Sequence, residues 1–465
     1  MPNSYSHETL FFKKTSDKCI DTLRQALQAT CTLIPIFNGK LAIDQPGRPP
    51  VIFHGQYSVQ KMLTIHNLAD NVDYQDLKDA CLRKAAERTP VLSEAIRLLS
   101  LAPPYSLQID GEAPVLRLTG AILRGGLALT INFHHLAFDL TSIAVFLRIL
   151  SAYCRDETPP PLSAECVSRD ILRNVSAADY EHHLAALNER IKPVAKPESK
   201  EHSVVAAAEQ VNAVPPPPPP LASAMVHFSD RALAQLKADV TAHLDPTSGP
   251  AWISTNDALM ALAWSCITSA SAEHDTHRIA VEGKRSAICM AVNLRHRLSP
   301  RLPTDYLGAA VCAPPFSAPI ELLRSASSSY TDLACLAQRI RAKVNTIDAE
   351  YVRRCFDTTS PPLADDEEEQ DATALMPTGP IDLTINSWAE QGACLHDWGK
   401  DFGGSCECAI RLNARSPSVY VMPRLPVKPN GGGGLLVHTT LEEETMERLR
   451  AVSYTHLTLP TIYSV

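Results

Sequence analysis

The stretch LALTINFHH, residues 127–135, alternates between apolar and polar positions. This two-residue period predicts a β-strand, because successive side chains of a strand point to opposite faces of its sheet. One face would carry Leu127, Leu129, Ile131, Phe133 and His135, and the other Ala128, Thr130, Asn132 and His134. The strand is expected to end near His135, whose imidazole would share the apolar face.

After Asp139 the period changes to that of a helix. An apolar stripe at helical spacing is formed by Ile143, Phe146, Leu147, Leu150 and Tyr153. We therefore predict a strand, a short turn and a helix, with Asp139 in the turn or at the helix start. Residues 16–34 and 254–270 also have helical spacing, and Ser16 is placed to cap the first of them.

A charged, proline-rich run divides the chain into halves of comparable size. Residues 191–220 are poor in large apolar side chains and end in six prolines, Pro215 to Pro220. The six prolines are extended and lack backbone hydrogen-bond donors, so we predict that the segment is a crossover linker. The predicted domains are 1–190 and 221–451, each mixing strands and helices. Residues 452–465 continue no helical pattern, and we expect a non-native or disordered tail there.

The composition is that of an ordinary globular protein, with 45% hydrophobic and 20% charged residues. A chain of 465 residues usually needs more than one core. The net charge of -8 argues against a nucleic-acid binder or a basic membrane-surface protein. No window offers the roughly 18 continuous apolar residues of a membrane span. We expect neither a nucleic-acid nor a membrane partner.

The 13 cysteines include no CxxC pair, and the N-terminal residues do not resemble a secretory signal. We therefore expect reduced, mostly buried thiols in a cytoplasmic protein. Cys406 and Cys408 have a spacing that two metal ligands can adopt, but no second pair or histidine completes such a site. The sequence thus predicts no bound metal.

His135 is the first candidate for chemistry. Imidazole has a pKa near 6.5, so a histidine at the end of an apolar wall can act as a general base at neutral pH. Asp139 is better placed to hold the turn, by accepting from backbone amides or by pairing with a distant arginine. For a bare HxxxD motif the favoured alternative is a satisfied core histidine followed by a helix cap, and a metal pair is a weaker one.

Further segments resemble one family in order along the chain. They are LRQALQATCTLIPIFNGKL, HHLAFD, STNDALMALAW, VNLRHRLSPRLPTDYLGAAV, the Ser-Trp pair and the Asp-Phe-Gly triplet of INSWAEQGACLHDWGKDFGGS, and LLVHTTLEEETMERL. Together they resemble the BAHD acyltransferase superfamily, and most of all its fungal branch. The resemblance implies a mixed α/β fold of two chloramphenicol-acetyltransferase-like domains, joined by a long crossover and separated by an active-site channel. It also implies a monomer with no permanently bound cofactor.

The resemblance assigns roles to individual residues. His135 would take the proton from a hydroxyl or amine of a small-molecule acceptor, which then attacks the thioester of acyl-CoA without an acyl-enzyme. Asp139 would be structural, with Arg295 as its partner. The turn at Asn386, Ser387 and Trp388 lies where the family presents oxyanion donors. The motif of Asp401, Phe402 and Gly403 would shape the fold around the channel.

Three positions depart from the family pattern. Leu140 replaces the glycine after HxxxD, Gly404 replaces the tryptophan of the DFGWG motif, and Ala309 replaces an asparagine. Trp398, six residues before Gly404, is a candidate for a displaced tryptophan. Because His135 and Asp139 are retained, we expect acyl transfer, with acetyl as the expected group and a secondary metabolite as acceptor. A condensation-domain-like peptide-bond former and a non-catalytic binding protein of the same fold are the alternatives.

Overall fold

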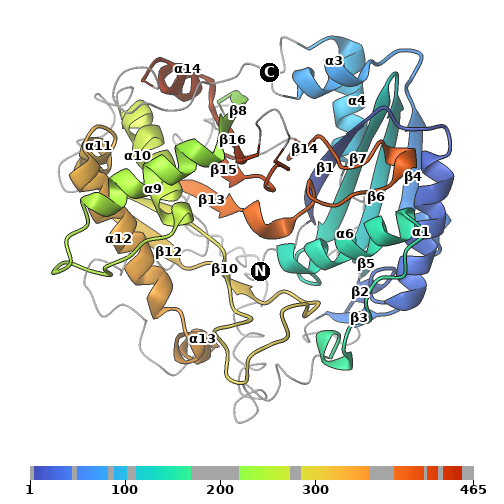
Figure 1. Ribbon diagram of the computed structural model, residues 1–465, viewed down its shortest axis with the longest axis horizontal. Helices are drawn as coiled ribbons and strands as arrows, with labels where there is room; N and C mark the ends of the chain where they lie inside the picture. Colours follow the sequence, from blue (N-terminus) through green and yellow to red (C-terminus); the bar gives the residue numbers. More distant parts are fainter. Residues whose placement is uncertain are drawn as a thin grey trace, which may run out of the picture.

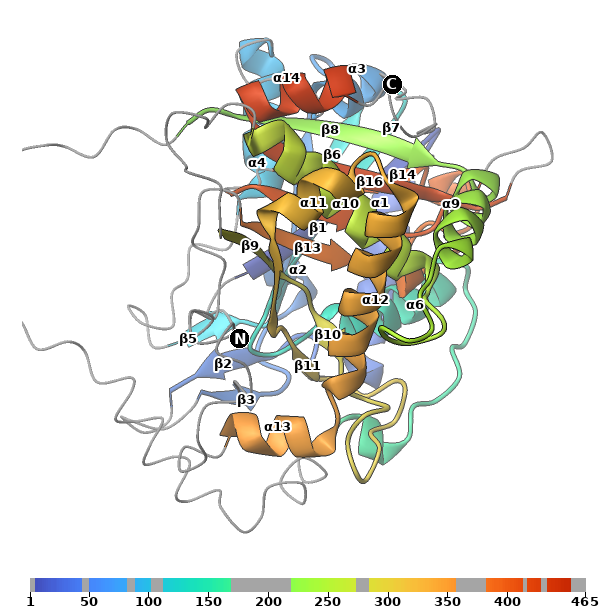
Figure 2. The same ribbon diagram turned by 90° about the vertical axis from the view of Figure 1, so that its left-hand side faces the viewer.

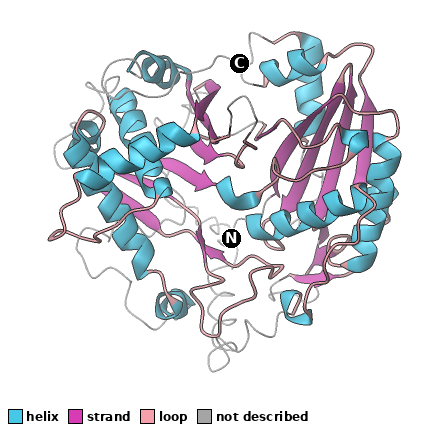
Figure 3. Ribbon diagram, in the orientation of Figure 1, coloured by secondary structure: helices cyan, strands magenta, loops and turns pink. Residues whose placement is uncertain are grey.

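The computed structural model describes residues 5–43, 50–81, 88–101, 112–168, 219–272, 284–356, 382–412, 416–427 and 433–452. These residues form two lobes side by side, each built on a β-sheet with helices packed against it (Figures 1 and 3). Nearly all of the predicted linker, and residues 453–465 of the predicted tail, lie outside the described residues.

The first lobe is built on a five-stranded sheet with the order β14-β1-β7-β6-β4. Its strands are β1 (Tyr5–Lys13), β4 (Leu63–Asn67), β6 (Leu116–Leu123), β7 (Gly126–His134) and β14 (Cys408–Ile410). The pair β4 and β6 is parallel, and the other neighbours are antiparallel. A smaller sheet joins β2 (Lys40–Ala42), β3 (Val51–Phe53) and β5 (Glu112–Pro114).

Helices cover both faces of this sheet. On one face, α1 (Cys19–Leu33) and α6 (Leu140–Cys154) pack against alternate residues of β1 and β7. On the other face, α3 (Tyr74–Ala80) and α4 (Pro90–Ser100) pack against the intervening residues. Two short helices, α2 (Val59–Met62) and η2 (Ala164–Cys166), complete the lobe. Because both faces are covered, β7 is buried along its whole length.

The second lobe is built on a six-stranded sheet with the order β12-β9-β13-β15-β16-β8. Its strands are β8 (Leu221–Phe228), β9 (Arg285–Cys289), β12 (Pro315–Pro319), β13 (Leu383–Ser387), β15 (Ser418–Val421) and β16 (Leu435–Glu442). The helices of the lobe are α9 (Asp230–Ala242), α10 (Thr255–Ala272), α11 (Ile320–Ala326), α12 (Tyr330–Thr346), α13 (Ala349–Phe356) and α14 (Glu443–Val452). Several of them stack on the sheet face that is turned away from the first lobe (Figure 2). The short strands β10 (Val292–Asn293) and β11 (Val311–Cys312) pair with each other.

One segment of the second half belongs to the first lobe. After β13, the chain forms η4 (Ala389–Gln391) and η5 (Lys400–Phe402), then adds β14 to the edge of β1 (Figure 1). The side chains of Trp398 and Phe402 pack edge-on against Phe12 of β1. If the chain is divided at residues 191–220, as predicted, this segment belongs to the second half by sequence but packs on the first lobe.

The strand, turn and helix predicted around the HxxxD motif are confirmed. β7 ends at His134, one residue before the predicted end, and α6 begins at Leu140. Helix α1 buries the predicted apolar face, but its predicted cap is wrong. The N-cap position is Lys18, and the Ser16 hydroxyl donates to the distant Asp401 carboxylate. None of the helices in the described ranges is long and apolar enough to cross a membrane.

Candidate active site

His135 follows directly after the end of β7, so its ring lies at the edge of the sheet. The ring is half-buried and makes an edge-on contact with Phe133, two residues earlier on the same face. Its Nε2 lies 2.7 Å from the Ser6 hydroxyl of β1, and its Nδ1 is buried without a hydrogen-bond partner. Within the described residues, the contact with Ser6 is thus the side-chain hydrogen bond that holds the ring.

Two effects keep the His135 imidazole neutral. Burial is the larger, because a charged ring is poorly solvated in an apolar environment. The positive charge of Arg411 is the second, and together they lower the pKa of His135 to about 4 despite the opposing effect of Asp139. At neutral pH the ring carries a free lone pair, which is the state that a general base requires.

His134 points to the other face of the sheet, as the alternation predicts. Its ring lies edge-on against Tyr5 with centroids 4.9 Å apart, and its Nδ1 accepts from the backbone amide of Leu136. Burial lowers the pKa of His134 to about 4, with His135 as a second cause. The doubled histidine therefore does not place two rings at one site.

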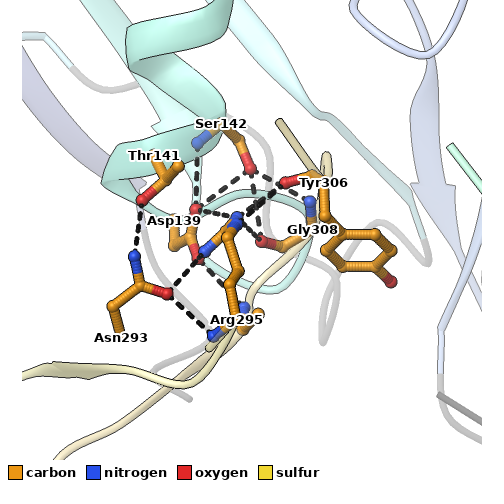
Figure 4. A network of polar contacts seen from close by, with 8 residues as sticks. Asp139, Thr141, Ser142, Asn293, Arg295, Tyr306 and Gly308 are labelled. Atoms are coloured by element: carbon orange, nitrogen blue, oxygen red, sulfur yellow. Dashed lines mark hydrogen bonds and ion pairs between the residues drawn. The ribbon is translucent and has the colours of Figure 1, made fainter. Parts of the chain in front are cut away.

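Asp139 lies at the centre of a saturated polar network (Figure 4). As the N-cap of α6, its carboxylate accepts from the amide and the hydroxyl of Ser142, each at 3.0 Å. It also accepts from both terminal nitrogens of Arg295, at 2.6 and 2.9 Å, and from the amide of Ala310 at 3.0 Å. Both side chains of the ion pair are almost completely buried.

Arg295 also donates to the side-chain oxygen of Asn293 and to two backbone carbonyls. The guanidinium donates to the carbonyl oxygens of Tyr306 and Gly308, and Ser142 exchanges hydrogen bonds with Gly308 (Figure 4). The network therefore joins the start of α6 to the 293–310 segment of the second half. A buried charge pair persists only when such partners satisfy both groups. These contacts bring Asp139 and Arg295 together, as predicted. The hydrogen bonds of the Asp139 carboxylate go to this network and not to the ring nitrogens of His135.

The turn of Asn386, Ser387 and Trp388 lies at the end of β13. Asn386 shares a sheet face with Tyr420 of β15, and its Oδ1 accepts from the Ala291 amide at 2.8 Å. The backbone amide of Trp388 donates to the Val421 carbonyl, so it is not available to a substrate. Within the described residues, the Asn386 Nδ2 and the Ser387 hydroxyl donate to no protein group. These two groups are the donors that the turn can offer to an oxyanion.

Arg411 is a site residue that the sequence reasoning missed. It follows β14, and its guanidinium lies 4.4 Å from the centroid of the Tyr420 ring. Tyr420 in turn lies edge-on to Trp388 and opposite His438 of β16. No carboxylate in the described part of the chain forms an ion pair with Arg411, so its charge acts on both His135 and His438. Its placement depends on β14 joining β1, and no local pattern predicts this.

The Asp-Phe-Gly motif, residues 401–403, supports the first lobe. Among the described residues, no hydrogen bond joins this motif to His135. The Asp401 carboxylate accepts from Thr22 at 2.7 Å and from Ser16 at 2.8 Å, which ties η5 to the start of α1. These bonds lower the pKa of Asp401. Gly403 has a φ of 72°, and a Cβ there would lie 2.6 Å from the Lys13 carbonyl oxygen. Only glycine fits at that point.

The three departures from the family pattern leave this framework in place. Trp398 is completely buried beside Phe402, with ring centroids 5.6 Å apart, and its amide donates to the Gly404 carbonyl. A Cβ at Gly404 would meet no atom within 4 Å, but the φ of 95° there favours glycine. The Asp139 network uses main-chain atoms on either side of Ala309, which do not depend on that side chain. Leu140 is half-buried at the start of α6 and packs against the core of the first lobe.

Comparisons with known proteins agree with this arrangement. The model of the Transferase family matches residues 97–455, which is more than half of the chain. The O-acetyltransferase ptmV of Penicillium ochrochloron is 24% identical over 380 residues, covering 76% of this chain and 73% of that protein. Trichothecene 3-O-acetyltransferase TRI101 of Fusarium sporotrichioides is 25% identical over 459 residues, covering 93% and 87%.

Solved structures show the same fold. F. sporotrichioides TRI101, complexed with coenzyme A and T-2, matches with a TM-score of 0.65 and 22% identity over 97% of this chain and 94% of that one. The first condensation domain of the CDA synthetase matches with a TM-score of 0.53 and 13% identity over 99% and 93%. The fold is thus the predicted mixed α/β fold of the chloramphenicol acetyltransferase type. The chain belongs to the Transferase family and is a BAHD acyltransferase that resembles the fungal trichothecene 3-O-acetyltransferases.

Proposed function

We propose that this protein transfers an acetyl group from acetyl-CoA to a hydroxyl or amine of a small secondary metabolite, with His135 as the general base. The observation that carries the proposal is the neutral, half-buried His135 at the end of β7, next to an Asp139 that is fully engaged elsewhere. A ring in that state is neutral at neutral pH, so its lone pair is available to accept the proton of the acceptor as the acceptor attacks.

The names of the relatives support the chemical class. TRI101 is a trichothecene 3-O-acetyltransferase, and another relative, from Penicillium roqueforti, is a fumigaclavine B O-acetyltransferase. The solved TRI101 structure contains coenzyme A and T-2. By analogy, acyl-CoA and a small acceptor are the two substrates of this chain, and no permanently bound cofactor or metal is needed. We further propose that the protein acts as a cytoplasmic monomer.

The reaction then needs no acyl-enzyme. His135 accepts the proton of the acceptor while its oxygen or nitrogen attacks the thioester carbonyl, and the rate gain comes from proximity and general-base catalysis. The Asn386 amide and the Ser387 hydroxyl donate to the tetrahedral oxyanion, and the charge of Arg411 favours it. Asp139, Arg295 and the Asp401 motif hold the structure around these groups.

The test is a screen of fungal metabolites with acetyl-, malonyl- and longer acyl-CoAs, read by the mass shift of the acceptor. We expect an acetylated product with the wild type, and no product with His135→Ala, which should still bind acyl-CoA. A wild type that binds ligands but transfers no group would make this a non-catalytic member of the fold. Aminoacyl condensation in place of transfer from CoA would support the condensation-domain alternative.

A further inference from the structure

The Ser6 hydroxyl is the polar group that meets His135 in this structure. Ser6 lies on β1 opposite Phe133 of β7, so both side chains of the contact come from the same face of the sheet. The residue is buried, and its Oγ lies 2.7 Å from Nε2 of His135. The two positions are 129 residues apart in the sequence and are brought together by nine paired positions of β1 and β7, which include Ser6 and end at His134, next to His135.

This contact involves the His135 nitrogen that is better placed to exchange a proton with a substrate. Nδ1 is buried and has no hydrogen-bond partner among the described residues, so we assign proton exchange to Nε2. Nε2 is already in contact with Ser6, whose backbone is held in β1 and whose side chain has a single rotatable bond before the hydroxyl. A hydroxyl both donates and accepts hydrogen bonds, and can therefore pass a proton in either direction.

We propose that Ser6 is a catalytic residue that relays the proton between the acceptor and His135. This inference rests on the proposed function. As the acceptor oxygen bonds to the thioester carbon, its proton moves to the Ser6 Oγ, and the Ser6 proton moves to Nε2. When the tetrahedral intermediate collapses, the carbon–sulfur bond breaks, the proton on Nε2 returns to Ser6, and the Ser6 proton passes to the thiolate of CoA. The net change is one proton moved from the acceptor to CoA.

The relay differs from direct general-base catalysis in the number of protons that move together. With the relay, two protons are being transferred in the transition state, whereas a direct transfer to His135 involves one. The rate of the wild type in mixtures of light and heavy water distinguishes the two, because two moving protons make its dependence on the heavy-water fraction curved. A linear dependence would overturn the relay even if no variant were made.

The matched variants are Ser6→Ala and Thr9→Val. Thr9 lies on the same strand and is also buried, but its hydroxyl contacts Thr130, on the other face of the sheet, at 2.7 Å. We expect Ser6→Ala to lower kcat about 100-fold, the lower range for a proton-transfer group, and Thr9→Val to leave kcat unchanged. The heavy-water dependence of the residual Ser6→Ala rate should become linear.

Other outcomes would overturn the inference. A Ser6→Ala variant that folds and keeps its kcat would show that His135 acts directly. An acyl adduct on Ser6, seen by mass spectrometry after incubation with acyl-CoA alone, would make Ser6 a nucleophile instead of a relay. If the wild type transfers no group to any acceptor, the proposed function fails first, and the relay falls with it. Transfer by the wild type with a linear heavy-water dependence leaves the function standing and removes the relay alone.

Discussion

The two ends of the HxxxD motif have opposite environments. Asp139 accepts five hydrogen bonds and pairs with a buried arginine, so nothing in its surroundings is left unsatisfied. His135, four residues earlier, makes one hydrogen bond within the described residues, to Ser6, and its buried Nδ1 has no partner among them. A carboxylate whose oxygens are all engaged is suited to holding the structure, whereas a ring with few contacts is available to a substrate. The difference supports the proposal that Asp139 maintains the structure and His135 carries the chemistry.

The largest effect on stability is expected for a substitution of Asp139. Asp139→Ala leaves the Arg295 guanidinium buried without its counter-charge, which should cost about 3–5 kcal/mol of unfolding free energy. Asp305→Ala is the matched control, because Asp305 also pairs with an arginine of α6, Arg148, but both side chains are partly exposed. That pair should contribute about 1 kcal/mol or less. Denaturant unfolding of both variants measures the contrast, and equal losses would contradict it.

The surroundings of Asp139 could be predicted from the sequence. The periods of residues 127–153 predicted β7, the turn and α6, and the family resemblance proposed Arg295 as the partner of Asp139. The position of His135 could be predicted, but two of its neighbours could not. Ser6 and Arg411 reach the His135 region because β1 pairs with β7 and β14, over separations of more than 100 residues. No local spacing reports such pairing.

The same limit explains the wrong cap at Ser16. Its position before α1 is that of a capping residue, but its hydroxyl donates to Asp401, 385 residues away. Glu8 is a further case, because a carboxylate on a buried strand gives no local sign of its partner. That partner is Gln391 of η4, whose amide donates to the Glu8 carboxylate at 2.6 Å.

Glu8 offers the next largest effect. Burial raises the pKa of Glu8 from 4.5 to about 7, while Gln391 opposes the shift. The folded state therefore keeps a proton that the unfolded state loses, and this contribution to stability is present below pH 4.5 and lost as the pH rises to about 7. Glu8→Gln keeps an acceptor for Gln391 and removes the titration. Relative to the wild type, it should gain about 3 kcal/mol of unfolding free energy between pH 4 and pH 8.

Unfolding curves of Glu8→Gln and the wild type at the two pH values check this prediction. Glu94→Gln is the control, because Glu94 is exposed and pairs with Arg97 of the same helix. A difference between Glu8→Gln and the wild type that does not change with pH would show that Glu8 is ionised in the folded protein throughout this range.

The smallest effect is expected for the charge beside His135. Burial and Arg411 lower the pKa of His135, so kcat/KM should fall only as the pH drops towards about 4, where the protonated ring can no longer accept a proton. Arg411→Met removes the second of these causes and should move that acidic limb upward by about one pH unit or less. Arg424→Met, at an arginine paired with Asp230, should not move it. An unchanged limb in Arg411→Met would contradict the electrostatic role of Arg411.

The division of roles within the motif is tested most directly by measuring kcat/KM and the unfolding free energy of His135→Ala on the same preparation. We predict that kcat/KM falls by about 100-fold to 10,000-fold, as for the loss of a general base. The unfolding free energy should change by much less than in Asp139→Ala, because the His135 ring makes one hydrogen bond within the described residues and Asp139 makes five. Acyl transfer that persists in His135→Ala, or a loss of stability as large as that of Asp139→Ala, would contradict the assignment of the chemistry to His135.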